Sequence, residues 1–200
     1  MEWARRLQAI AQNGLEFSQD EFDRLRYEQV RVVAAEMAGA GSAQPLDHVL
    51  DLFGRDVGYT TPKVDVRGAV FRDGEILLVR ESGLWTLPGG WADVEDTPRE
   101  AVEREVREES GYEVRATKLA MCLDRTRHPH VPPRPWRIYK LFFRCELLGG
   151  DPVPDGRETD AAEFFPPDAL PQLDLGRVTP GQIARLVEHE RDPARATDFD

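Results

Sequence analysis

The 200-residue sequence has few cysteines and no long apolar run. Its two cysteines, Cys122 and Cys145, lie in apolar, strand-like segments, so we expect buried, reduced thiols rather than a disulfide or a metal site. No apolar segment is long enough to span a bilayer, and the first residues lack the apolar core of a signal peptide. These absences exclude membrane-spanning and disulfide-stapled classes and predict a cytoplasmic protein without a membrane partner.

Positive charge is also scarce. The chain has 26 Lys and Arg against 37 Asp and Glu, which gives a net charge of −11. A surface of that sign repels polyanions, so nucleic acid is an unfavourable partner. Apolar residues make up 40% and charged residues 32%, a balance typical of folded globular proteins. A small phosphate substrate would need local neutralisation, which divalent cations could supply.

The order of the predicted elements indicates an α/β protein that follows a small all-helical N-terminal domain. Apolar residues recur at helical spacing through residues 1–56. From residue 62 the pattern changes and predicts strands at 63–71, 75–81, 112–125, 136–148 and 162–166, with helices at about 97–110 and 179–190. Such an order favours a mixed sheet with helices on its faces. We assign this second domain to residues 62–192 and expect a frayed tail at 193–200.

The helix at 97–110 has clear start and stop signals. Thr97 is a capping residue, Pro98 suits the first turn, and Glu100 lies three residues after the cap. Gly111 is a typical residue for ending a helix. Glu103 is predicted to lie on the solvated face.

The last turns of this helix carry three glutamates on one side. Glu105, Glu108 and Glu109 are spaced i, i+3 and i+4, so they repel one another, and they lie at the negative end of the helix dipole. Mg²⁺ or Mn²⁺ prefers oxygen ligands and would bring the missing positive charge. The alternative is that these are ordinary surface charges of an acidic protein.

Two features beside the glutamates support a site. Arg104 lies four residues from both Glu100 and Glu108, so it can pair with either and hold a carboxylate in place. The segment Leu-Pro-Gly-Gly before the helix predicts a tight turn with bare backbone, which could offer the carbonyl of Gly89 to a metal.

Residues 90–112 resemble the signature of the Nudix family. The signature is a glycine, five residues, an acid, seven residues, Arg-Glu, an apolar residue, any residue, Glu-Glu, any residue, glycine and an apolar residue. The matching positions are Gly90, Asp96, Arg104, Glu105, Val106, Glu108, Glu109, Gly111 and Tyr112. Asp96 departs from the usual glutamate, and its shorter side chain could weaken the loop or shift the metal geometry.

The resemblance implies an α/β/α sandwich with a mixed sheet and hydrolysis of a nucleoside diphosphate linked to another group, with Mg²⁺ or Mn²⁺. It implies that Glu105 and Glu109 are metal ligands, that Glu108 is a ligand or the general base, and that Arg104 orients Glu105. The metals would cancel charge on the diphosphate while a carboxylate activates water.

In several family members the general base lies in a loop before a late strand. Glu158 is the candidate in this chain, with Glu163 second, and a solvated loop acid is the alternative. The helical start, together with "DVRGAVF", "LWTLPGGWADV", "LDRTRHPH" and "YKLFF", is similar to the subgroup with an N-terminal helical domain. That resemblance implies ADP-ribose or CDP-choline hydrolysis and a homodimer, with residues 1–56 as dimerisation domain or substrate arm.

Five further residues are candidates for substrate binding. Arg67 and Arg80 could reach the diphosphate, because a guanidinium binds phosphate oxygens bidentately; for Arg80 a surface role is the alternative. His128 lies in a loop predicted to line the substrate. Trp91 and Tyr139 could stack on a base or ribose, with core or interface packing as the alternative.

Two other functions compete with hydrolysis of a nucleoside diphosphate derivative. One is a nucleotide-sensing module on a Nudix scaffold, since a fold alone does not fix function. The complete set of Arg104, Glu105, Glu108 and Glu109 disfavours it. The other is removal of an RNA cap, which the net charge of −11 disfavours.

Overall fold

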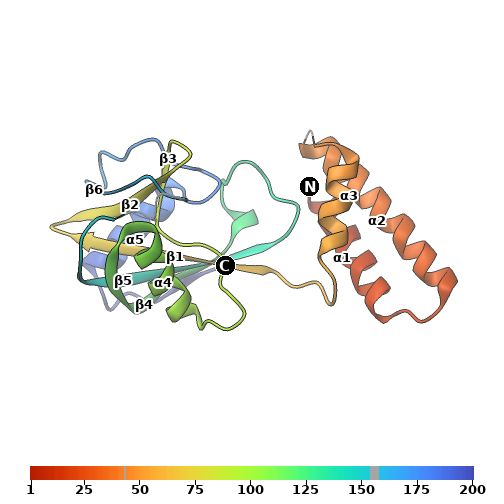
Figure 1. Cartoon of the computed structure of the whole chain (residues 1–200), viewed down its shortest axis with the longest axis horizontal. Helices are drawn as coiled ribbons and strands as arrows, with labels where there is room; N and C mark the ends of the chain where they lie inside the picture. The colour runs from red at the N-terminus through yellow and green to blue at the C-terminus, as the bar shows by residue number, and fades with distance from the viewer. Residues whose placement is uncertain (43, 154–157) are drawn as a thin grey trace. The chain divides into compact units, whose positions relative to one another are not determined.

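The computed structural model describes residues 1–42, 44–153 and 158–200. The chain forms two compact units (Figure 1). The first comprises residues 1–62 together with 132–137, and the second comprises residues 63–131 and 138–200. Among the described residues, no helix combines the length and apolar character needed to cross a bilayer.

The first unit is helical. Its elements are α1 (Glu2–Phe17), α2 (Glu21–Ser42) and α3 (Leu46–Arg55). Small side chains dominate its core, which is formed by Ala4, Ala34, Ala35, Ala38, Val49 and Phe53. A Cβ atom added to Gly14 would lie 2.3 Å from the Tyr27 ring, so α1 and α2 approach closely at that glycine. The core is small, and large apolar side chains remain on the outside of the same helices.

These outer side chains follow a regular spacing. Trp3, Ile10 and Phe17 are seven residues apart on α1, and each is more than half exposed. A seven-residue spacing keeps side chains on one face of a helix. Phe22 and Leu25 at the start of α2 are exposed as well. The helical unit therefore presents apolar surface that its own core does not bury.

The second unit is built on a mixed sheet. Its strands are β1 (Lys63–Arg72), β2 (Glu75–Glu81), β3 (Leu84–Thr86), β4 (Tyr112–Asp124), β5 (Ile138–Gly150), β6 (Ala161–Phe165) and β7 (Asp198–Phe199). The strand order is β3-β2-β1-β5-β4-β7, with β6 paired to β2. The pairs β1–β5 and β4–β7 are parallel, whereas β1–β2, β2–β3, β2–β6 and β4–β5 are antiparallel. The predicted mixed sheet is confirmed.

Helices cover both faces of this sheet. Helix α4 (Pro98–Ser110) lies so close to β1 that a Cβ atom on Gly68 would be 2.5 Å from the Val106 side chain. Helix α5 (Pro180–Arg191) packs Ile183 and Leu186 against the cluster that contains Ala69 and Phe142. Alternation along β1 sends Gly68 and Ala69 to opposite faces. The α/β/α sandwich is therefore confirmed, with the helices α1, α2 and α3 before it.

The predicted ends of α4 are confirmed. The Thr97 hydroxyl accepts from the Glu100 amide, and the Glu100 carboxylate accepts from the Thr97 amide at 2.9 Å. Gly111 ends the helix with φ 79°, a left-handed conformation that favours glycine. These contacts are local, which is why the sequence predicts them.

The expectation of a frayed tail is wrong. Asp198–Phe199 form β7, which pairs with Met121 and Cys122 of β4. The Thr197 hydroxyl also donates to the Leu119 carbonyl at 2.7 Å. The tail is ordered because its backbone pairs with the edge strand β4. The polar sequence of the tail does not reveal that pairing. Cys122 and Cys145 are free thiols, as expected; Cys145 is buried, whereas the expectation that Cys122 is buried is wrong, because that side chain is partly exposed.

Candidate active site

The segment before α4 runs antiparallel to β1 and is joined to it by backbone hydrogen bonds and a single bridge between Asp65 and Trp91. The Val66 amide donates to the Gly90 carbonyl at 2.8 Å. The Gly68 amide donates to the Pro88 carbonyl at 2.9 Å. Because these two carbonyls face β1, alternation turns the carbonyl of Gly89 to the other side. Gly89 has φ 140°, and an added Cβ atom would lie 2.1 Å from the Val66 oxygen, so the position accepts only glycine.

Two glutamates of α4 meet this glycine pair. The Gly89 amide donates to Oε2 of Glu109 at 2.8 Å, and Glu109 is 4% exposed. The Glu105 carboxylate lies against Gly90, where an added Cβ atom would be 2.7 Å from Oε2. The absence of side chains at both glycines therefore lets two carboxylates from successive turns reach the same stretch of backbone.

Burial makes negative charge unfavourable at both carboxylates. It raises the pKa of Glu109 to about 7, although Arg67 and the hydrogen bond from Gly89 act in the opposite direction. Burial also raises the pKa of Glu105, opposed by Arg104 and Arg67. A cation placed between these groups would remove that penalty.

Arg104 binds the acids around the start and the end of α4. Its guanidinium donates to Asp96 at 3.0 Å, to Glu105 at 3.0 Å and to Glu108 at 3.1 Å. Of the two predicted alternatives, it pairs with Glu108, while Glu100 is engaged in the helix cap. The shorter Asp96 still reaches Arg104. One planar guanidinium thus ties the loop to two of the signature glutamates.

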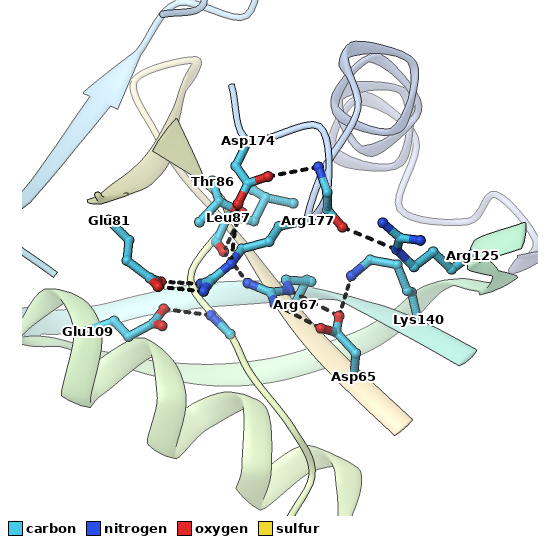
Figure 2. A network of polar contacts seen from close by, with 12 residues as sticks. Asp65, Arg67, Glu81, Thr86, Leu87, Glu109, Arg125, Lys140, Asp174 and Arg177 are labelled. Carbon is cyan, nitrogen blue, oxygen red and sulfur yellow. Dashed lines mark hydrogen bonds and ion pairs between the residues drawn. The ribbon is translucent and has the colours of Figure 1, made fainter. Parts of the chain in front are cut away.

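A buried ionic network lies beneath the glycine pair. Asp65 of β1 accepts from Nε of Arg67 at 3.0 Å and from its terminal nitrogen at 2.8 Å. Lys140 of β5 donates to the same carboxylate at 2.5 Å. The other terminal nitrogen of Arg67 donates to the Leu87 carbonyl at 3.1 Å. Figure 2 shows Asp65 between Lys140 and Arg67, with Glu109 on the far side of Arg67.

Arg177 is a second cation near Glu109. It pairs with Glu81 at 2.6 Å and with Asp174 at 3.4 Å (Figure 2). Arg177 and Arg67 both act to lower the pKa of Glu109 against the larger effect of burial. Sequence reasoning found Arg67 but missed Arg177, Asp65 and Lys140. The available signal for Asp65 was its charge at an inward-facing position of the otherwise valine-rich strand β1.

The other substrate-binding candidates lie at the surface. Trp91 is 47% exposed and Tyr139 is 43% exposed, so neither is a core residue. Arg80 pairs with Asp160 at 2.7 Å, in keeping with the surface role that was its alternative. His128 is half-buried, and its Nε2 lies 3.2 Å from an oxygen of the Asp200 side chain.

The base candidates lie in and after the loop that follows β5. The Thr159 hydroxyl donates to the Glu109 carbonyl at 2.7 Å, which brings the neighbouring Glu158 to the end of α4. Glu158 is exposed, and residues 154–157 before it lie outside the described part of the chain. Glu163 is exposed on β6. The pKa of Arg80 is raised mainly by the hydrogen bond and charge of Asp160, and Glu163 adds a smaller effect in the same direction.

The prediction that Glu103 is solvated is wrong. Its carboxylate accepts from the Ala116 amide of β4 at 2.8 Å. The register of β4 against β5 shifts between Ala116 and Lys118, and the glutamate takes the place of a ladder partner. Helical periodicity could separate Glu103 from the site residues, but it could not reveal a bulge on a neighbouring strand.

The carboxylate and carbonyl oxygens at this site are of the donor type that fits a hard divalent cation. Within the described residues, no group of three or more His, Cys, Asp or Glu is gathered tightly enough to hold a metal as it stands. Glu105, which is partly buried, and Glu109, which is buried, nevertheless present their carboxylates on one side of the helix, and burial disfavours their charge. Carboxylate oxygen is the ligand type that Mg²⁺ and Mn²⁺ prefer.

Known proteins match both units. Residues 61–187 match the family model described as the NUDIX domain, and residues 1–53 match a "UDP-X-like, N-terminal oligomerisation domain". A protein of Bacillus subtilis (strain 168), named provisionally as the ADP-ribose pyrophosphatase YjhB, is 45% identical over 202 residues. The match covers 100% of this chain and 96% of that protein.

Two solved structures extend the comparison. The crystal structure of an ADP-ribose pyrophosphatase from Streptococcus suis 89-1591 is 43% identical, with a TM-score of 0.65, and covers 70% of this chain and 100% of that one. The crystal structure of a UDP-X diphosphatase is 32% identical, with a TM-score of 0.64, and covers 100% of this chain and 97% of that one. By its signature, its sandwich and these matches, the chain belongs to the Nudix family and is a Nudix hydrolase.

Proposed function

We propose that this hydrolase is a metal-dependent pyrophosphohydrolase that cleaves a nucleoside diphosphate linked to another group. The observation that carries the proposal is the placement of Glu105 and Glu109, two carboxylates from successive turns of α4, against the bare backbone of Gly89 and Gly90. We expect ADP-ribose as the first substrate, with AMP and ribose 5-phosphate as products. The names of the relatives from Bacillus subtilis and Streptococcus suis support this choice.

The residues of the site have distinct roles in this proposal. Glu105 and Glu109 would hold Mg²⁺ or Mn²⁺, with the Gly89 carbonyl as a neutral ligand and Glu108 as a further ligand or the base. When bound, such an ion would neutralise charge on the diphosphate and acidify a water molecule. Arg104 orients Glu105, which its ion pair at 3.0 Å supports. A ligand fixed by a neighbour loses less freedom on binding the ion.

Binding the diphosphate and removing a proton from the attacking water require further side chains. Arg67 supplies positive charge beside the carboxylates, while Arg80, His128, Trp91 and Tyr139 contact the rest of the substrate. The exposure of Trp91 and Tyr139 leaves their rings available for stacking. Removal of a proton from water falls to one of the exposed acids, for which the sequence offers three candidates.

Those candidates are Glu108, Glu158 and Glu163. The contact of Thr159 with the end of α4 favours Glu158 over Glu163, which lies on β6. Replacing each by glutamine and recording the rate against pH separates them, because loss of the base removes the limb of the profile that reports its ionisation.

A second substrate class is a UDP-linked compound. The UDP-X diphosphatase structure matches the whole of this chain, including the helical unit, and this coverage favours the alternative. A panel of ADP-ribose, UDP-sugars, CDP-choline, NADH, diadenosine polyphosphates, nucleoside triphosphates and capped RNA, with Mg²⁺ or Mn²⁺, ranks the candidates. Turnover of at least one nucleoside diphosphate derivative is expected.

The control for this panel is a matched pair of variants. Glu109→Gln should lose turnover by at least about a hundredfold, because it removes a charged ligand. Glu113→Gln changes an exposed glutamate of β4 and should leave turnover unchanged. Absence of turnover with every compound would sink the proposal, and tight binding without turnover would favour the nucleotide-sensing module instead.

We further propose that the protein is a homodimer formed through the helical unit. The exposed stripe of Trp3, Ile10 and Phe17 on α1 supports this proposal, because apolar surface of that regularity is costly in water. Sedimentation velocity should show a dimer for the wild type and a monomer for Ile10→Glu. Val57→Glu, at an exposed position outside the helices, is the control and should remain dimeric.

A further inference from the structure

We propose that Asp65, braced by Lys140, is a positioning residue that holds Arg67 off the carboxylates of Glu105 and Glu109 and so keeps them open to a divalent cation. The inference rests on the proposed metal-dependent function. It assigns a task to two buried charges that touch neither the glycine pair nor the signature glutamates.

The grip on Arg67 is directional. Asp65 binds two nitrogens of the guanidinium, at 3.0 and 2.8 Å, and the Leu87 carbonyl binds the third at 3.1 Å. Every nitrogen of the group therefore has an acceptor other than Glu105 or Glu109, and Asp65 takes two of the three on the side opposite Glu109 (Figure 2). Arg67 is 3% exposed, so water offers no competing partner.

Lys140 fixes the carboxylate that makes this grip. It lies opposite Asp65 in the parallel β1–β5 register, on the same face of the sheet, and donates to Oδ1 at 2.5 Å. Lys140 is 1% exposed and Asp65 is 6% exposed. A buried carboxylate held by partners on two strands cannot rotate without breaking one of its ion pairs.

Without that grip, Arg67 would find a new partner nearby. Glu109 and Glu105 both attract the guanidinium, and Glu109 is a buried carboxylate that accepts from the Gly89 amide at 2.8 Å. An arginine released from Asp65 would move to these carboxylates, because a bidentate pair in a buried site is strongly favoured over a lone charge. It would then occupy the place of the metal ion.

A double-mutant cycle on Mn²⁺ binding tests this arrangement without substrate. Free Mn²⁺ is measured by electron paramagnetic resonance during titration of each folded variant, with folding checked by circular dichroism. Asp65→Asn should weaken Mn²⁺ binding by about tenfold or more. In the Arg67→Met background the same substitution should change binding by less than about twofold, because no arginine remains to be held.

Lys140→Met provides a second route that keeps the Asp65–Arg67 pair intact. It should weaken Mn²⁺ binding less than Asp65→Asn does, and this effect should also vanish in the Arg67→Met background. Asp51→Asn is the matched control, because Asp51 pairs with Arg55 at 2.6 Å on the exposed surface of α3, and it should leave Mn²⁺ binding unchanged.

The outcomes separate this inference from the proposed function. If Asp65→Asn changed the Mn²⁺ affinity equally in the wild-type and Arg67→Met backgrounds, the positioning role alone would be overturned. If Asp65→Asn did not fold, an equal change for Lys140→Met in both backgrounds would have the same consequence. Failure of the wild type to bind Mn²⁺ at all would overturn the metal-dependent function on which it rests. A large effect with Arg67 and none without it supports both.

Discussion

Replacing Glu109 by glutamine should stabilise the metal-free protein at alkaline pH. Burial raises the pKa of this carboxyl from its ordinary 4.5 to about 7. The unfolded chain therefore ionises Glu109 above pH 4.5, whereas the folded protein keeps the proton until about pH 7. The free energy of unfolding thus falls as the pH rises through this window, by about 3 kcal/mol at roughly 1.4 kcal/mol per pH unit.

Glutamine retains an oxygen that can accept from the Gly89 amide, and it carries no charge. The difference in unfolding free energy between Glu109→Gln and the wild type should therefore increase by up to about 3 kcal/mol between pH 5 and pH 8. Urea denaturation in the presence of EDTA at both pH values measures it. Adding Mn²⁺ at pH 8 should reverse the order, because an ion that binds only the folded wild type stabilises it.

The control is Glu113→Gln on the exposed face of β4. The difference in unfolding free energy between this variant and the wild type should not change with pH. A constant difference for Glu109→Gln at pH 5 and pH 8 would refute the reasoning, because it would mean that the carboxyl is not destabilised by burial. The comparison uses differences between variants, since other groups also contribute to the pH profile of the wild type.

Three further perturbations probe the surroundings of the site. Gly89→Ala should lower the unfolding free energy by about 3 kcal/mol in a urea titration, because Gly89 has a positive φ and an added Cβ atom would clash with Val66. Gly74→Ala is the control and should cost about 1 kcal/mol, because Gly74 has a positive φ but open space around it. Burial lowers the pKa of His130 to about 4. The unfolding free energy of the wild type should therefore fall by about 2 to 3 kcal/mol relative to that of His130→Gln as the pH falls from 6.5 to 4. A difference between the two proteins that does not change with pH would contradict this. Arg104→Lys should reduce kcat for ADP-ribose by about ten- to a hundredfold, since a single ammonium nitrogen lacks the spread with which the guanidinium nitrogens reach Asp96, Glu105 and Glu108. Wild-type kcat in this variant would argue against the orienting role.

The parts of the fold that sequence could predict are those decided by neighbours in the chain. Thr97, Glu100 and Gly111 fix the ends of α4 through contacts within a few residues, so their pattern is readable. The pairing of Asp198 with Met121 is decided by an unfilled strand edge far along the chain, and no local pattern marks it. Short strands at sheet edges are therefore the elements that such reasoning misses.

The same limit applies to the site. Helical periodicity was enough to place Glu105 and Glu109 on one side of α4. The contact between Asp65 and Lys140 joins residues 75 positions apart through a parallel strand pair, and its register follows from the whole sheet. Sequence therefore predicts the carboxylates of the site better than the cations that surround them.

The hydrogen bonding of residues 88–90 to β1 has a consequence for how this protein can diversify. Because alternation decides which carbonyl faces β1, inserting or deleting one residue in this segment would turn the Gly89 carbonyl toward the strand and its neighbours away from it. The segment can therefore change neither its length nor its glycines without losing the site. We expect new substrate preferences to arise in connections that do not pair with β1, such as the one between β4 and β5. Insertions there leave the carboxylates of α4 in place.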